Sequence, residues 1–122
     1  MIVLDTNVLI EILKGNEETI KKVESFTDTL CISSITVMEL YYGALNKAEL
    51  NKLEKFVSLF HIIHLSEDIS KSSTKLIKKY AKSHSLDIQD SLIAATALDN
   101  DAELLTYNLK DFKYIEGINL LK

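Results

Sequence analysis

Four acidic side chains lie where a carboxylate is unusual, and they are the residues of this chain best suited to chemistry. Asp5 directly follows a short apolar run, and Glu39 is the only charge in an otherwise apolar segment. Asp90 falls in the first turn of an expected helix, and Asp111 comes just after an expected strand. Since a carboxylate is costly to remove from water unless something pairs with it, these four acids predict a shared site.

A cluster of carboxylates indicates a bound cation, because neighbouring acids cannot all remain ionised without one. A hard divalent ion such as Mg²⁺ or Mn²⁺ takes oxygen ligands and keeps bound waters. Such an ion activates water and polarises a phosphoryl oxygen, so the four acids favour phosphodiester hydrolysis. Polar residues at the expected strand ends could hydrogen-bond the carboxylates or an attacking water: Thr6, Asn7, Thr106 and Asn108. Asn108 is also an alternative to Asp111 as the fourth group of the site.

Short apolar runs alternate with amphipathic segments, which predicts an α/β fold with a mostly parallel sheet covered on both faces. Ligands of such sheets bind at the carboxyl ends of the strands, where Asp5 is expected. Asn16, Ser66 and Asp87 are each predicted to cap the helix that follows, and the last of these helices carries Asp90. Strands are expected at 2–5, 30–33, 61–64, 104–106 and 118–121. Helices are expected at 7–14, 17–26, 35–45, 47–59, 67–84 and 88–98.

The composition predicts one compact domain over residues 1–122, since the chain has no proline and no linker-like segment. The single cysteine, Cys31, allows no intrachain disulfide. The start of the chain lacks the basic region of a signal peptide, and no apolar run approaches the ~20 residues of a membrane span. We therefore expect a cytoplasmic protein that has no contact with a membrane.

The charge balance excludes nucleic-acid binding through overall charge, because the net charge is −4 and the pI about 5.3. All 14 basic residues are lysines, so phosphate contacts would use ammonium groups rather than guanidinium forks. The chain has no glycine-rich phosphate loop, so its sequence does not indicate nucleotide binding. An aspartate-nucleophile phosphatase would need a second aspartate where Asn7 stands.

Four segments of the chain resemble PIN-domain ribonucleases, specifically VapC-type toxins of bacterial and archaeal toxin–antitoxin pairs. The matching segments, in the family's order, are 2–10, 33–43, 90–97 and 105–112. The resemblance implies a three-layer αβα fold whose central, mostly parallel sheet has four or five strands. It also implies RNA cleavage that depends on Mg²⁺ or Mn²⁺, a homodimer, and a VapB-like antitoxin that blocks the site.

The resemblance assigns Asp5, Glu39 and Asp90 to the acidic site, with Asp5 and Asp90 first as direct metal ligands. The family's fourth acid is carried to Asp111, because Asn108 stands where some relatives have an aspartate. The implied activity is that of an endoribonuclease toxin, in which metal-activated water hydrolyses RNA and leaves a 5′-phosphate and a 3′-hydroxyl. The alternative is a catalytically inactive PIN-like module that binds RNA or protein, although the joint presence of the three acids speaks against it.

Overall fold

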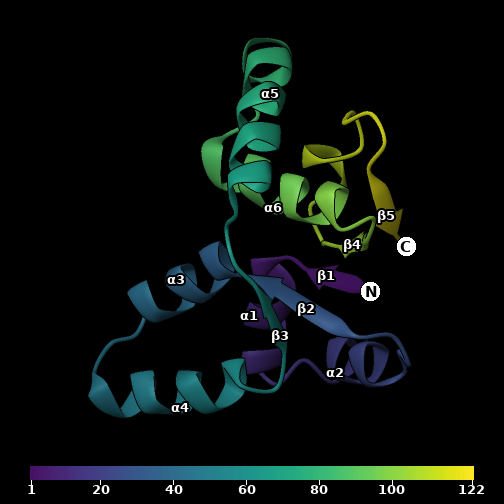
Figure 1. Cartoon of the computed structure of the whole chain (residues 1–122). Coiled ribbons are helices and arrows are strands. Elements are labelled where there is room, and N and C mark those ends of the chain that lie inside the picture. Colours follow the sequence, from purple (N-terminus) through teal and green to yellow (C-terminus); the bar gives the residue numbers. More distant parts are fainter.

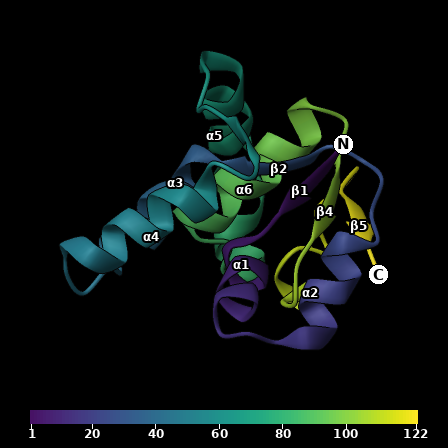
Figure 2. The ribbon, with the colours of Figure 1, turned by 90° about the horizontal axis from the view of Figure 1, so that it is seen from below.

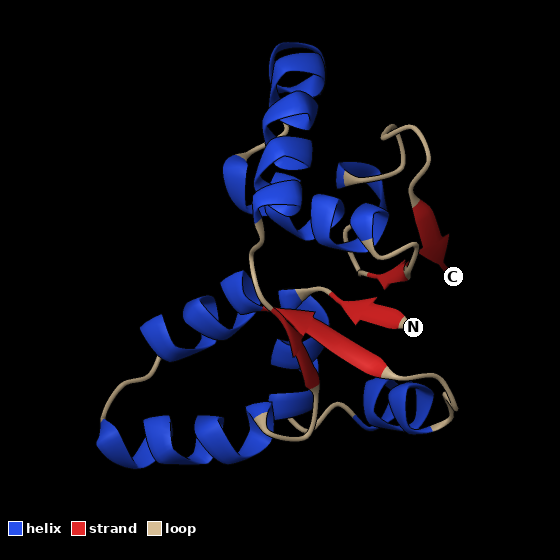
Figure 3. Ribbon diagram, viewed as in Figure 1, coloured by secondary structure: helices blue, strands red, loops and turns tan.

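Five short strands form one sheet in the computed structural model, which describes residues 1–122 (Figures 1 and 3). The strand order is β3-β2-β1-β4-β5, and every neighbouring pair is parallel. The predicted mostly parallel sheet is thus confirmed. The strands are β1 (Ile2–Leu4), β2 (Leu30–Ser33), β3 (His61–Ile63), β4 (Glu103–Leu105) and β5 (Asn119–Leu121).

The order of the strands reverses beside β1. The chain passes outward from β1 through β2 to β3, and later returns to form β4 and β5 on the other side of β1. Leu4 pairs with Leu105, so the chain leaves β1 and β4 at the same level of the sheet. Such a reversal opens a crevice at the carboxyl ends of the strands, where open α/β sheets bind ligands.

Six α-helices and one short 3₁₀ helix connect the strands. The α-helices begin at side chains that accept a hydrogen bond from the first turn, as the predicted caps Asn16, Ser66 and Asp87 do. The helices are α1 (Thr6–Leu13), α2 (Glu17–Glu24), α3 (Ser34–Tyr42), α4 (Lys47–Val57), α5 (Glu67–His84) and α6 (Ile88–Asp99), and the 3₁₀ helix is η1 (Leu109–Asp111).

Helices cover both faces of the sheet, and side chains alternate between two cores. Val3, Cys31 and Leu104 point into a core shared with α5 and α6. Leu4 and Ile32 point into a second core, built with residues from the α1, α2, α3 and α4 helices. Figure 2, which views the molecule from below, shows α2 and α4 on the near side of the sheet. The three-layer αβα arrangement is therefore as expected.

Three helices end two or three residues earlier than predicted, the first of them at Glu24 instead of residue 26. The helix expected to reach residue 45 ends at Tyr42, because Gly43 forms its C-cap, and glycine is a poor helix former. The next helix ends at Val57, two residues before its expected end, with Ser58 as its C-cap. None of the helices combines the length and the apolar composition that crossing a membrane would require.

Candidate active site

Asp5 occupies the junction of β1 and α1, where it is the N-cap of the helix instead of the last residue of the strand. Its side chain is buried, with 5% of its surface exposed. One carboxylate oxygen accepts from the Thr6 backbone N–H at 2.8 Å, and the other accepts from the Thr106 hydroxyl at 2.7 Å. Burial raises the pKa of Asp5 above its usual value, although these hydrogen bonds oppose the rise.

Asn7 connects Asp5 to the segment that follows β4. Its Nδ2 donates to the second carboxylate oxygen of Asp5 at 3.3 Å, and its Oδ1 accepts from the Tyr107 backbone N–H at 3.2 Å. The hydroxyl of Thr106 accepts in turn from the Asn108 backbone N–H at 3.0 Å. Asp5 is therefore held in one orientation by groups from both sides of the strand reversal.

Glu39 reaches the same region from α3 through a pair of threonines. The Thr6 hydroxyl donates to Oε1 of Glu39 at 3.0 Å and lies 3.0 Å from the hydroxyl of Thr36, which is fully buried. A hydroxyl has one proton to give, so Thr36 is the donor to Thr6. Partial burial raises the pKa of the Glu39 carboxyl.

Asp90 lies near the start of α6, and its carboxylate accepts no hydrogen bond from the protein, in contrast to Asp5. Burial, followed by the negative charges of Asp87, Asp5 and Asp111, raises the pKa of Asp90 to about 7. Near neutral pH this carboxylate therefore holds its proton about half of the time. A group in this state favours the arrival of a cation, because a cation would relieve the repulsion.

The three acids converge on one cavity of about 220 Å³ at the strand reversal. Asp5, Glu39 and Asp90 all line this cavity, which we call the acidic cavity. Among the predicted polar residues, Thr6, Asn7 and Asn108 also line it, and Thr106 lies behind Asp5. The structure thus brings together residues from the β1–α1 junction, α1, α3, α6 and the segment after β4, which lie far apart in the sequence.

The fourth group predicted for the site stays open between two residues. Asn108 lines the acidic cavity, whereas Asp111 does not. Asp111 lies on η1 and is close enough for its charge to raise the pKa of both Asp5 and Asp90. Asn108 is therefore placed to contact a bound group directly, and Asp111 to act through its charge.

The donors of the acidic cavity fit a hard divalent cation, since they are carboxylate, hydroxyl and amide oxygens without a thiol or imidazole. No three acidic, imidazole or thiol side chains of the chain lie close enough together to form a closed metal site. Mg²⁺ is usually held by one or two carboxylates and several waters. Asp5 and Asp90 line the open acidic cavity, which thus has the carboxylates that such an ion would need.

Two residues contribute to the site in ways that the sequence did not reveal. Asp87 caps α6 as predicted, accepting from the Asp90 backbone N–H at 2.7 Å, but its charge also raises the pKa of Asp90. Thr36 supports the contact between Thr6 and Glu39. Thr36 precedes Glu39 by three residues on a helix, a spacing that places two side chains on one face and could have identified it.

The sequence of the chain matches the model of the PIN domain over residues 2–118. The chain belongs to the PIN-domain family. Ribonuclease VapC19 of Mycobacterium tuberculosis is 32% identical over 116 residues, which cover 92% of each protein. A tRNA(fMet)-specific endonuclease VapC of Salmonella typhimurium is 31% identical over 123 residues, covering 96% of this chain and 93% of that protein.

Solved structures show the same similarity for this PIN domain. A chain of a toxin–antitoxin complex from Klebsiella pneumoniae superposes with a TM-score of 0.85 and 34% identity, covering 100% of this chain and 97% of that one. A chain of VapBC2 from Rickettsia felis, bound to a DNA fragment from its promoter, superposes with a TM-score of 0.86 and 30% identity. The match covers 99% of this chain and 98% of that one. The predicted membership in the VapC group of PIN-domain ribonucleases is confirmed.

Proposed function

We propose that this VapC-type PIN domain is a metal-dependent endoribonuclease and the toxin of a toxin–antitoxin pair. The observation that carries the proposal is the convergence of Asp5, Glu39 and Asp90 on one cavity at the strand reversal. Relatives of similar length and 31–32% identity are named as ribonucleases or endonucleases. The raised pKa values of the three acids support a site built for a cation instead of one built for stability.

Asp5 and Asp90 would hold the ion, for which we propose Mg²⁺ or Mn²⁺. When bound, the ion would lower the pKa of a water molecule and polarise a phosphoryl oxygen. Thr106 and Asn7 keep the Asp5 carboxylate oriented. Glu39, whose pKa is raised by burial, would accept a proton from the attacking water. The P–O3′ bond of the RNA would break, leaving a 5′-phosphate and a 3′-hydroxyl.

A VapB-like antitoxin is the proposed protein partner, since the structural neighbours include complexes of toxins with antitoxins. An apolar groove of about 220 Å³ on the face opposite α5 supports this partner. Seven of its eight lining residues are hydrophobic, among them Ile20, Phe56 and the exposed Leu59. Exposed apolar grooves of this kind typically mark a protein interaction site.

A homodimer is proposed from the family and from an exposed apolar face of α3. Met38 and Tyr42 lie four residues apart on α3, which places them on one side of the helix, and Leu45 follows in the segment between α3 and α4. Tyr42 is 94% exposed and Leu45 86%. We call these three residues the α3 patch, and we propose that a second copy of the chain covers it.

Cleavage of mixed cellular RNA by purified, antitoxin-free protein tests the proposed function. We expect cleavage with Mg²⁺ or Mn²⁺ and none in EDTA, and we expect Asp90→Asn to abolish it. Asp68→Asn, which changes an exposed acid on α5, is the matched control and should cleave normally. A folded wild-type protein that cleaves with neither metal would favour the inactive binding module.

A further inference from the structure

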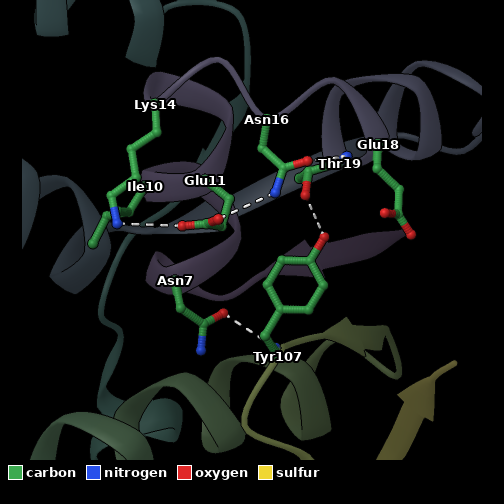
Figure 4. A pocket seen from close by; sticks show the side chains of 8 residues that line it. All are labelled: Asn7, Ile10, Glu11, Lys14, Asn16, Glu18, Thr19 and Tyr107. Carbon is green, nitrogen blue, oxygen red and sulfur yellow. Dashed lines mark hydrogen bonds and ion pairs between the residues drawn. The ribbon is translucent and has the colours of Figure 1, made fainter.

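A second, larger cavity adjoins the acidic cavity. It has a volume of about 490 Å³ and lies between α1, α2 and the segment after β4 (Figure 4). Asn7 and Ile10 line both cavities, so they form the boundary between the two. The volume falls within the roughly 300–1,000 Å³ of small-molecule sites. A group bound here would therefore lie directly beside a phosphate bound at the acids.

The aromatic ring of Tyr107 forms one wall of this second cavity and is fixed from two sides. Its hydroxyl lies 2.6 Å from the hydroxyl of Thr19, which is itself buried. Its backbone N–H donates to Asn7. The side chain nevertheless remains 45% exposed. A held aromatic ring with a free face is a surface on which RNA-binding proteins stack an unpaired base.

The polar groups of the second cavity differ in whether they already have partners. Glu11 accepts from Asn16 Nδ2 at 3.1 Å and pairs with Lys14 Nζ at 3.5 Å. Asn16 Oδ1 caps α2 by accepting from the Thr19 backbone N–H at 3.2 Å. Glu18 makes neither a side-chain hydrogen bond nor a salt bridge, and its side chain extends from α2 toward the Tyr107 side of the cavity (Figure 4). Glu18 is thus the free acceptor of the cavity.

We propose that this second cavity is a guanine-binding subsite, in which the base stacks on Tyr107 and its Watson–Crick edge is read by Glu18. The inference rests on the proposed function, because the base would belong to a nucleotide next to the phosphate that is cut. An ionised carboxylate only accepts hydrogen bonds, through two oxygens. Guanine alone among the four RNA bases offers two adjacent N–H donors on that edge, N1–H and the N2 amino group.

Binding of short oligonucleotides in EDTA tests this subsite apart from cleavage. The probes are fluorescent five-residue RNAs of uridine with guanosine, inosine or adenosine at the centre, and the readout is anisotropy. We expect the guanosine probe to bind about tenfold more tightly than the other two, as for the loss of one well-formed base contact. Glu18→Gln should remove this preference, because its amide nitrogen cannot accept.

Glu17→Gln is the matched control, since Glu17 is an exposed neighbour on α2 that lies outside the cavity. It should keep the guanosine preference. Tyr107→Ala should weaken binding of the guanosine probe more than Tyr107→Phe does, because phenylalanine keeps the ring and loses only the hydroxyl contact with Thr19. Equal binding of the three probes by the wild type, or an unchanged preference in Glu18→Gln, would overturn the subsite.

The two proposals fail in different ways. A protein that prefers the guanosine probe but cuts no RNA would contradict the nuclease and support the subsite. A protein that cuts RNA but binds all three probes equally well would support the nuclease and contradict the subsite. If Glu18→Gln weakens binding of the antitoxin and leaves the guanosine preference intact, the cavity is an antitoxin contact and the subsite is wrong.

Discussion

Asp5 and Asp90 line the same cavity, but their carboxylates differ in how many hydrogen bonds they accept. Asp5 accepts three hydrogen bonds, whereas the Asp90 carboxylate accepts none and faces four other acids that raise its pKa. In the metal-free protein, Asp90 is therefore the acid of this site whose ionised form is least stabilised by its surroundings. Two predictions at the scale of single residues follow from this difference.

The Asp90→Asn variant should be more stable than the wild type when metal is absent. The folded-state pKa of Asp90, about 7, exceeds the usual 3.8 of an aspartate, so metal-free wild type loses stability as the pH rises from about 4 to 7. Each pKa unit corresponds to about 1.4 kcal/mol. Because Asp90 is partly solvated, we expect a gain of only about 1–2 kcal/mol at pH 8. Calorimetric unfolding in EDTA measures this gain.

The same series at pH 4 provides the control for the stability prediction. Near that pH the carboxyl of Asp90 stays protonated in the folded protein and is about two-fifths protonated in the unfolded one, so most of the difference in stability between the two proteins should disappear. A gain that is equally large at pH 4 would show that the asparagine acts by packing and that ionisation of Asp90 is not the cause.

The apparent affinity for Mn²⁺ should rise with pH up to about 7 and then level off. The reason is that a proton on Asp90 competes with the ion until the pH exceeds the pKa of that group. Asp87→Asn should keep the helix cap, since asparagine also caps helices. It should move the levelling-off to lower pH, because the Asp87 charge raises the pKa of Asp90. Titrations between pH 5.5 and 8.5 measure both, and an unchanged profile would contradict the role given to Asp87.

At the scale of elements, α6 brings Asp90 to the sheet because its buried face is made of small residues. Ala94 and Ala97 are almost completely buried in the core that α5, α6 and the sheet share. Leucine at position 97 would overpack this contact, and we expect Ala97→Leu to lower the free energy of unfolding by about 1–3 kcal/mol. Ala48→Leu on α4 changes an exposed alanine and should leave it within about 0.5 kcal/mol. Chemical denaturation compares the two, and equal losses would contradict the close packing of α6.

The starts of helices could be predicted from the sequence where a capping residue marks them. Asn16, Ser66 and Asp87 cap helices in the structure as they were expected to. Helix ends were harder to predict, as the early end of α3 at Gly43 shows, because a helix end depends on tertiary contacts as well as propensity. Asp5 and Glu39 could be proposed as site acids from the sequence because each is a charge in apolar surroundings.

Contacts between distant segments could not be predicted from the sequence. The strand order places Thr106 beside Asp5, although 101 residues separate them. No local pattern shows that Asn108 lines the cavity and that Asp111 does not. The second cavity has the same origin, because Tyr107 meets Thr19 only once β4 has been placed beside β1.

At the scale of the whole molecule, the exposed α3 patch predicts self-association. Tyr42→Ser should shift the protein toward monomer, because a 94% exposed tyrosine contributes little to the fold of one chain and much to an interface. Leu59→Ser is the control, since Leu59 is also exposed but lines the apolar groove, to which none of the patch residues contributes. Sedimentation velocity measures both. A Tyr42→Ser dimer as stable as that of the wild type would place the interface elsewhere.

We propose that Asp5 and Asp90 together hold one divalent ion at the strand reversal. The decisive experiment is calorimetric titration of Mn²⁺ into the antitoxin-free protein at pH 7.5. We expect saturable binding to the wild type and to Asp68→Asn, and a loss of at least about tenfold in affinity for Asp5→Asn, which keeps the shape of the side chain but removes its charge. Binding of Mn²⁺ to Asp5→Asn with wild-type affinity would contradict the claim.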